Sequence, residues 1–497
     1  MERYDLIVIG GGPAGYAAAG QAAKGGLSVA LFERRSLGGV CLNEGCIPTK
    51  SLLYAAKMLD NAAHGAAFGL MIGPAALDHK AVVSRKDKVV KTLVSGVGAK
   101  MKSHGVDVFP ASAAIQGKTA GGFAVEAGGQ AFTASKLLIA TGSAPVIPPI
   151  PGVREGLDSG FVVTSREILD MQEVPERLLI VGGGVIGLEM AGYFSAAGSK
   201  VLVVEMLDKI AGPFDPEIST ILQKNLEKRG VEFRLGAKVS AVGPDGVRIE
   251  PAGGGPGTAA PAPNGGSKPA GAPAPNGGSK PAGIPAGATA PAGDPAGSFA
   301  ADNVLLSIGR KPATEGIGLE NIGLAAEGGA IATDRMMRTS VPGVYAAGDV
   351  NGKSMLAHTA YREAETAVNN MLGRKGYMRY SAIPSVIYTQ PEAAGAGETE
   401  ASAAENGFAA KCIKLSMRYA GRYVAENDGG DGICKLIIDT KSRRVLGAHM
   451  IGSYASEIIS SAVFMIESGW PLETLKEIVF PHPTVGEILR EALFEME

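Results

Sequence analysis

The chain has 497 residues, 45% of them hydrophobic, and a formal net charge of −2. This length exceeds what one ordinary hydrophobic core holds, so we expect three or four domains. The near-neutral charge argues against nucleic acid or an anionic membrane as partner, and no apolar run approaches the roughly 18 residues of a membrane span.

Residues 5–33 have the pattern of a strand, a glycine turn, a helix and a second strand. Gly10, Gly12 and Gly15 fit the spacing G-x-G-x-x-G, which lets the backbone approach a pyrophosphate at a helix N-terminus. Glu33 ends the second strand, where a carboxylate can accept a hydrogen bond from a ribose hydroxyl. A structural turn is the alternative, but the strand, helix and terminal acid together favour dinucleotide binding.

The apolar run at 6–9 follows the first residues without a basic leader and cleavage site, so we expect a cytoplasmic protein, although a processed organellar chain would look the same.

Two cysteines, Cys41 and Cys46, follow closely on this glycine loop. A dithiol beside a bound cofactor can accept and release two electrons, which makes the chain a candidate disulfide oxidoreductase. A structural disulfide and half of a zinc site are the alternatives. A structural zinc ion takes about four ligands, and no second close Cys/His pair exists in the sequence. Lys50 lies four residues beyond Cys46, so its ammonium group can reach the same region.

Residues 178–205 repeat the strand, glycine turn, helix and strand pattern, with glycines at Gly182, Gly184 and Gly187. The last strand ends at Glu205, whose carboxylate would bind a ribose 2′-hydroxyl and repel a 2′-phosphate. Residues 206–208 supply no arginine for such a phosphate. The second unit therefore favours NAD over NADP.

The segment 251–298 consists almost wholly of Pro, Ala, Gly, Ser, Asn and Lys, and residues 262–271 recur at 274–283. It lacks the apolar side chains that would offset its ordering entropy, so we predict that it is disordered. Strand-like residues 247–250 and 303–308 flank it. We therefore interpret it as a long insertion between two strands, which loop-closure entropy tolerates at a cost of about 2 kcal/mol.

Beyond residue 310, a strand within the segment 339–349 delivers Asp349 to a tight turn, although this segment alone could be a capped helix start. A helix is predicted over 357–372. The C-terminal part alternates strands with helices. We predict strands at 383–388, 411–417, 433–438 and 445–451, and helices at 453–468, 471–478 and 485–495. Cys412 and Cys434 fall in strand-like surroundings, and we interpret them as small core residues.

The cysteine pair, both glycine loops, the Asp349 segment and the C-terminal run 481–484 together resemble the flavin-dependent pyridine nucleotide–disulfide oxidoreductases. The resemblance spans nearly the whole chain except 251–298. It implies an α/β fold with two Rossmann-like dinucleotide-binding domains and a C-terminal α+β dimerisation domain. The implied domains are 1–147 (FAD-binding, first part), 148–308 (NAD-binding, with the insertion), 309–378 (FAD-binding and central) and 379–497 (dimerisation).

The resemblance also implies which residues hold the two cofactors. The FAD-binding set would be Gly10, Gly12, Gly15, Glu33, Lys50, Thr141, Gly142, Ser143, Asp349, Met355, Leu356, Ala357 and His358. The NAD-binding set would be Gly182, Gly184, Gly187, Glu189, Glu205, Val239 and Gly309. No metal is implied.

The activity that the resemblance implies is oxidation of protein-bound dihydrolipoamide to lipoamide, with reduction of NAD. Cys41 would exchange with the substrate dithiol, Cys46 would lie against the flavin, and Lys50 would pair with Glu189 near the flavin ring. The expected partners are a second copy of the chain and the lipoyl domains of a multienzyme complex.

A base is needed to form the attacking thiolate, and the resemblance assigns this role to His482, oriented by Glu487. In the family this histidine comes from the neighbouring subunit, which would make the homodimer obligatory. On the sequence alone, a single histidine between prolines is more often structural. Two positions depart from the family pattern: Phe480 stands where another histidine is usual, and Val40 where threonine is commoner.

Three other functions stay open. A glutathione reductase would normally carry arginines after Glu205 for NADP, and a mercuric reductase would normally carry paired C-terminal cysteines; this chain has neither. A non-catalytic flavoprotein scaffold would not need both cysteines, the base and its orienting acid.

Overall fold

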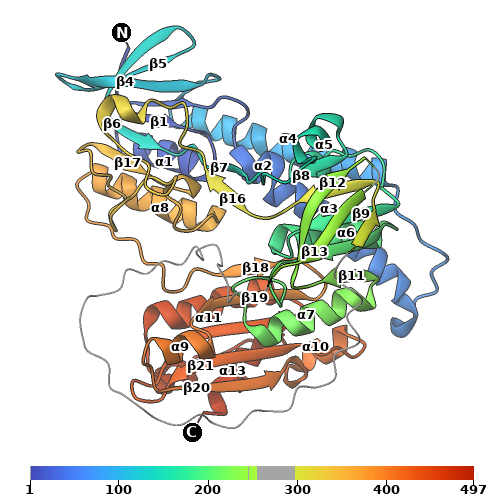
Figure 1. Ribbon diagram of the computed structural model, residues 1–497. Helices are drawn as coiled ribbons and strands as arrows, with labels where there is room; N and C mark the ends of the chain where they lie inside the picture. The colour runs from blue at the N-terminus through green and yellow to red at the C-terminus, as the bar shows by residue number, and fades with distance from the viewer. Residues whose placement is uncertain (1, 245, 254–296, 497) are drawn as a thin grey trace.

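The computed structural model describes residues 2–244, 246–253 and 297–496. Figure 1 shows three regions, one around each of three large sheets: the first at upper left, the second at upper right and the third below them. Among the described residues, the structure contains no helix long and apolar enough to cross a membrane.

The first sheet has seven strands, in the order β3-β2-β1-β6-β5-β4 with β17 paired to β6. Its parallel part follows from the apolar runs of the N-terminus, since strands covered on both faces lack a polar alternation; all four residues of β2 are buried. Helix α1 (Pro13–Lys24) packs against α8 (Ala357–Met371) beside this sheet. The strands are β1 (Glu2–Ile9), β2 (Val29–Phe32), β3 (Asp107–Phe109), β4 (Ala113–Thr119), β5 (Gly122–Ala127), β6 (Gln130–Ile139) and β17 (Val344–Ala346).

Strand β17 comes from a part of the chain some two hundred residues after β6, yet its residues 344–346 pair with 137–139. The pairing returns the chain to the first sheet after the second sheet is complete. The segment that carries Asp349 therefore lies at the same sheet edge as the first glycine loop, because parallel strands share one carboxyl end.

The second sheet is wholly parallel, in the order β11-β10-β9-β15-β8. Helices α5 (Val153–Ser159), α6 (Val185–Ala196) and α7 (Pro216–Lys228) accompany it. The strands are β8 (Val162–Thr164), β9 (Arg177–Val181), β10 (Lys200–Val204), β11 (Val231–Arg234) and β15 (Asn303–Leu306).

A small antiparallel sheet, β12-β13-β14, follows β11. It contains β12 (Ala237–Gly243), β13 (Gly246–Pro251) and β14 (Gly297–Ala300). The predicted disordered segment 251–298 lies outside the described residues except at its ends. There the prediction was wrong: Pro251 belongs to β13, which extends past the predicted strand 247–250, and Gly297 and Ser298 belong to β14, an unpredicted strand that pairs antiparallel with β13.

The third sheet is antiparallel throughout, in the order β18-β19-β22-β21-β20. Its strands are β18 (Ser385–Ile387), β19 (Glu392–Gly397), β20 (Ala410–Ser416), β21 (Ile433–Asp439) and β22 (Arg444–Gly452), and its helices are α9 (Glu400–Glu405), α10 (Gly421–Glu426), α11 (Ala455–Ser468), α12 (Leu472–Lys476) and α13 (Glu487–Phe494). Every predicted strand and helix of this region is present, but β19, α9 and α10 were not predicted. Strand β19 reads Glu-Ala-Ala-Gly-Ala-Gly, which has little intrinsic strand propensity and pairs through its neighbours.

The two remaining cysteines differ in environment. Cys434 is fully buried in the core of the third sheet, as predicted. Cys412 is only partly buried, so its prediction as a core residue was wrong. Cys412 lies in the edge strand β20, and its thiol is beside the Glu400 carboxylate. Burial, and to a smaller extent that carboxylate, raises the pKa of the Cys412 thiol to about 12.

The fold is therefore α/β with two Rossmann-like units and a C-terminal α+β region. Four further elements position the site: α2 (Gly39–Glu44), α3 (Cys46–Ala63), β7 (Ser143–Pro145) and β16 (Arg310–Pro312). Helix α4 (His79–Ser103) packs against α3.

Candidate active site

The two predicted dinucleotide loops have the same construction. In the first, the Glu33 carboxylate accepts hydrogen bonds from the Gly11 and Arg35 amides at 2.7 and 2.8 Å. In the second, the Glu205 carboxylate accepts from the Gly183 and Leu207 amides at 2.7 and 2.9 Å. Each acid thus holds its own glycine loop against the carboxyl end of its sheet. Each loop opens directly into a helix, α1 or α6.

The reason for a glycine differs among the loop positions. A Cβ on Gly10 would lie 2.2 Å from the Ala140 carbonyl oxygen, and one on Gly15 would lie 1.8 Å from the Gly10 oxygen. The same close packing within the protein explains Gly182 and Gly187, where a Cβ would lie 2.6 Å and 2.2 Å from backbone oxygens.

The middle glycines have no such explanation. A Cβ on Gly12 would meet no atom closer than 3.9 Å, and one on Gly184 would meet none within 4 Å among the described residues. Both positions are N-caps, of α1 and α6, without a side-chain cap. A side chain there would obstruct only a ligand at the helix N-terminus, so both loops fit the pyrophosphate of a dinucleotide.

The cysteine pair lies where α2 ends and α3 begins. Cys41 is in α2 and Cys46 is the first residue of α3. Both are free thiols, not joined by a disulfide, and both are partly buried. Glycines at 38 and 39 adopt positive φ angles of 91° and 55°, which reverses the chain between the Glu33 segment and α2. A Cβ on Gly39 would lie 2.7 Å from the Gly12 Cα, so the cysteine helix begins in contact with the first glycine loop.

The two thiols are electrostatically unequal. The hydrogen bond from Cys41, followed by the Lys50 charge, lowers the pKa of Cys46 to about 7 against the opposing effect of burial. The same hydrogen bond, followed by burial, raises the pKa of Cys41. In the dithiol state the thiolate therefore forms at Cys46, and Cys41 keeps the proton. A low-pKa thiol is also the better leaving group in thiol–disulfide exchange.

Lys50 is held by two groups from other parts of the chain. Its Nζ lies 3.0 and 2.9 Å from the two carboxylate oxygens of Glu189, which is buried in α6. The predicted contact between Lys50 and Glu189 is therefore present. The sequence did not indicate Tyr388, whose ring centroid lies 4.3 Å from Lys50 Nζ and whose amide donates to Glu189 at 3.0 Å.

Replacement of Lys50 tests the origin of the thiolate. We expect Lys50→Met to raise the apparent pKa of Cys46 above its value of about 7, because the variant removes the positive charge that favours the thiolate. The measurement is the rate of Cys46 alkylation against pH in the dithiol protein, with the modified peptide located by mass spectrometry. An unchanged pH profile would mean that Lys50 does not stabilise the thiolate.

One side of the site is closed by a polar network around Asp349. Ser143 donates to the Asp349 carboxylate at 2.5 Å, and Arg310 donates to the Ser143 Oγ and carbonyl oxygen at 2.7 and 2.8 Å. Burial raises the pKa of Asp349. Thr141 and Gly142 bond to Ala313 in the same crossing, where β7 pairs with β16. Arg310 was not predicted, although the run Gly309–Pro312 after a strand could have drawn attention to it.

A second residue that sequence reasoning missed is Glu363. Its fully buried carboxylate accepts hydrogen bonds from the Gly348 amide, Asn351 and Tyr380 at 2.7, 2.8 and 2.6 Å. These bonds fix the turn that presents Asp349. An acid on a predicted helix face gives no signal of such a role in a single sequence.

The predicted segment Met355–His358 leads into α8. Leu356 is the N-cap and Ala357 the first helical residue, without a side-chain cap. His358 is hydrogen bonded to the Pro384 carbonyl oxygen at 2.8 Å, and burial lowers its pKa. A Cβ on Gly348 would lie 3.5 Å from the Ala360 Cβ, so the first turn of α8 lies beside the turn that carries Asp349, where a helix N-terminus can stabilise negative charge.

Two predicted NAD positions have structural surroundings of different kinds. Val239 is buried in a core cluster that includes Val181 and Val204, the last residues of β9 and β10. Gly309 has a φ of 115° and follows Ser307, which hydrogen bonds to the Gly182 carbonyl oxygen at 3.0 Å. Gly309 thus lies next to the second glycine loop, whereas the Val239 side chain supports the strands beneath it.

His482 and Glu487 form the predicted pair. The His482 Nδ1 lies 2.9 Å from a Glu487 oxygen, and the other oxygen accepts from the Thr484 amide at 2.7 Å. The His482 side chain is 77% exposed, so its Nε2 is presented to the outside of the chain. Figure 1 shows α13, which begins at Glu487, in the lower region and α2 in the upper one. The helix that begins at Glu487 and the helix that carries Cys41 thus lie in different regions of one chain.

The alternative of a zinc site finds no support in the described part of the chain, where no three His, Cys, Asp or Glu side chains form a group that could hold a metal ion. The site defines the class of protein as a dinucleotide-dependent dithiol oxidoreductase. It combines two glycine loops, each held by an acid, with a dithiol between them whose two thiols differ in pKa.

Known proteins agree with this class. Residues 4–364 match the family described as pyridine nucleotide-disulphide oxidoreductase, and residues 383–493 match its dimerisation domain. The chain belongs to this family of flavoprotein oxidoreductases, which use FAD and a pyridine nucleotide.

Several curated relatives match over their whole length. The chain is 37% identical to dihydrolipoyl dehydrogenase 3 of Pseudomonas aeruginosa, over 100% of this chain and 98% of the relative. It is 35% identical to dihydrolipoyl dehydrogenase of Chlamydia muridarum, over 99% and 96%. Among solved structures, the copper(II) complex of the HOCl-induced flavoprotein disulfide reductase RclA of Escherichia coli superposes with a TM-score of 0.78 at 25% identity, covering 99% of this chain and 98% of that one.

Proposed function

We propose that this chain is a dihydrolipoyl dehydrogenase, which oxidises protein-bound dihydrolipoamide to lipoamide and reduces NAD. The observation that carries the proposal is the pair Cys41 and Cys46, two thiols of different pKa placed between two glycine loops. Each loop is held by a carboxylate, Glu33 or Glu205. The identity to relatives named dihydrolipoyl dehydrogenase, over nearly the whole chain, supports it.

The thiol chemistry of the proposal uses four residues. A substrate thiolate attacks the Cys41 sulfur of the Cys41–Cys46 disulfide, forms a mixed disulfide, and releases Cys46 as a thiolate. The lowered pKa of Cys46 makes it the leaving group. His482, oriented by Glu487, takes the proton from the substrate thiol and so produces the attacking thiolate. The second substrate thiol then displaces Cys41 and closes the lipoamide disulfide.

The cofactors would be held by the residues described above. FAD would lie on the first glycine loop and against Asp349, with Lys50 and Glu189 beside its ring, and NAD on the second glycine loop. When bound, FAD accepts the electron pair of the dithiol and passes it to NAD as hydride. Glu205 would accept a hydrogen bond from an adenosine ribose 2′-hydroxyl, and its negative charge would oppose a 2′-phosphate.

A homodimer completes the site in this proposal. The exposed His482 would reach the cysteine pair of the neighbouring subunit, and the match of residues 383–493 to a dimerisation domain supports such an assembly. The domains would be those inferred from the sequence, with boundaries near 147, 308 and 378. Lipoyl domains of a multienzyme complex would be the protein substrates, and the expected location is the cytoplasm.

A parallel assay tests the function. We expect the purified yellow protein to reduce NAD with dihydrolipoamide, and to show at least about 100-fold lower kcat/KM with glutathione disulfide and NADPH, because Glu205 opposes the 2′-phosphate. Preference for the glutathione pair would make it a glutathione reductase. Full FAD loading without turnover on either pair would instead favour a non-catalytic scaffold.

A further inference from the structure

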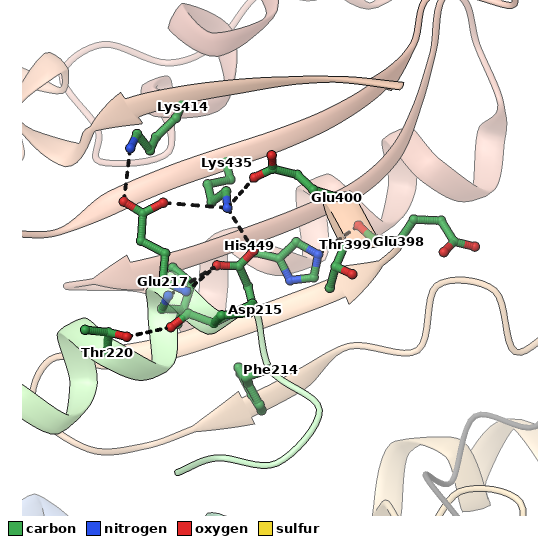
Figure 2. A network of polar contacts seen from close by, with 12 residues as sticks. Phe214, Asp215, Glu217, Thr220, Glu398, Thr399, Glu400, Lys414, Lys435 and His449 are labelled. Carbon is green, nitrogen blue, oxygen red and sulfur yellow. Dashed lines mark hydrogen bonds and ion pairs between the residues drawn. The ribbon is translucent and has the colours of Figure 1, made fainter. Parts of the chain in front are cut away.

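A cluster of charged side chains, centred on the buried pair Lys435 and Asp215, joins the second sheet region to the third. Lys435 of β21 is 4% exposed and Asp215 is 1% exposed. The Lys435 Nζ lies 2.9 Å from Asp215, 2.5 Å from Glu400 and 3.6 Å from Glu217. Figure 2 shows the ammonium group between these three carboxylates, two of them from the start of α7 and one from α9. The dithiol chemistry uses none of these groups.

Asp215 has two functions in this cluster. One carboxylate oxygen caps α7, accepting from the Glu217 and Ile218 amides at 3.0 and 3.3 Å. The other accepts from Lys435. Burial is the largest single effect and raises the pKa of Asp215, but the hydrogen bond and charge of Lys435, together with the Ile218 amide, outweigh it, so the pKa is lowered overall. The N-terminus of α7 is therefore attached to β21.

The segment between Glu205 and Asp215 runs from the second glycine loop to this cluster. The Ala211 amide donates to the Gly183 carbonyl oxygen at 2.8 Å. Ala211 has a φ of 62°, which is strained for a residue with a Cβ and persists only where both flanks are held. One flank is held by Lys209, whose Nζ donates to the Gly212 and Phe214 carbonyl oxygens at 2.6 and 2.9 Å. The other is held by Asp215.

We propose that Lys435 is a positioning residue for NAD, which acts through Asp215 and the 206–214 segment on the glycine loop at Gly183. The proposal rests on the function proposed above. Loss of the Lys435 charge leaves the buried Asp215 carboxylate without its counter-charge, beside Glu217 and Glu400, whose side chains are 39% and 54% exposed. The uncompensated buried charge drives Asp215 and the α7 N-terminus away from β21. Ala211 then relaxes, and Gly183 loses the hydrogen bond from the Ala211 amide, so that of its bonds to Ala211 and Glu205 only the second is left.

The test measures NAD affinity directly on the oxidised flavoprotein, by calorimetric titration with NAD. We expect Lys435→Met to raise the dissociation constant of NAD by about tenfold. The rate of flavin reduction by dihydrolipoamide should stay within about twofold, because the cysteine pair is not part of the cluster. Asp215→Asn, which retains an oxygen to cap α7, should weaken NAD binding in the same direction.

Lys414→Met is the matched control. Lys414 lies opposite Lys435 in the neighbouring strand β20 and contacts the same Glu217 at 3.0 Å, but its side chain is 52% exposed and it does not contact Asp215. We expect an unchanged dissociation constant for NAD, since an exposed ion pair contributes little.

Three results would overturn the positioning assignment. The first is a folded Lys435→Met or Asp215→Asn protein with wild-type NAD affinity. The second is a dihydrolipoamide half-reaction that slows by as large a factor as NAD binding weakens. The third is failure of both variants to fold, which would make the cluster an element of stability only. A wild-type protein that turns over dihydrolipoamide but does not bind NAD would instead refute the proposed acceptor, and this inference with it.

Discussion

Cys41→Ser will lose dihydrolipoamide oxidation by about 10⁴-fold or more, while NADH still reduces the flavin at the wild-type rate. Serine cannot form the mixed disulfide with substrate, whereas Cys46, Lys50 and both glycine loops stay in place. The measurement is stopped-flow flavin bleaching, once with dihydrolipoamide and once with NADH. The two half-reactions should separate completely.

The control for this variant is Cys412→Ser. Cys412 is also a partly buried thiol, but it lies in β20 of the third sheet. We expect wild-type rates in both half-reactions. If Cys41→Ser retained normal lipoamide turnover, Cys41 would not be the exchanging thiol and the proposed mechanism would be wrong.

His482→Gln will slow the thiol half-reaction by about 10²- to 10⁴-fold, the range of a general base, and leave exchange between NADH and flavin unaffected. Glutamine occupies similar space and can still hydrogen bond to Glu487, but it cannot accept the thiol proton. Stopped-flow measurement of each half-reaction gives the two effects separately. Equal slowing of both would show that His482 is not the thiol base.

His64→Gln provides a histidine of similar geometry as the control. His64 is 71% exposed and its Nδ1 lies 3.5 Å from Asp60, so it is another exposed imidazole beside a carboxylate. It lies just after α3, away from α13. We expect no change in either half-reaction for this variant.

A mixture of the two defective chains tests whether the base comes from the partner subunit. In a heterodimer of Cys41→Ser and His482→Gln chains, one site combines an intact cysteine pair with an intact His482 only if the histidine crosses the interface. Co-expression should then restore roughly a quarter of wild-type turnover, one site in half of the dimers. A base from the same chain would leave the mixture inactive.

Part of the site was accessible from the sequence because it is local. Gly10, Gly12 and Gly15 stand within six residues between a strand and a helix, and the spacing of such loops is set by turn geometry and helix periodicity. The same reasoning placed Glu33 and Glu205 at strand ends, where both carboxylates are found. The contact of Lys50 with Glu189 was available only through the family resemblance, since 139 residues separate the two.

The sequence by itself determined the class of fold, the two dinucleotide loops and the dithiol, because apolar periodicity, glycine spacing and neighbouring cysteines are properties of short segments. Only the tertiary structure decided the unequal character of the two thiols, the support of Asp349 by Arg310 and Glu363, and the attachment of Lys435 to Asp215. These depend on burial and on contacts between residues as many as 220 positions apart. Chain topology sets such contacts, and no local pattern encodes them.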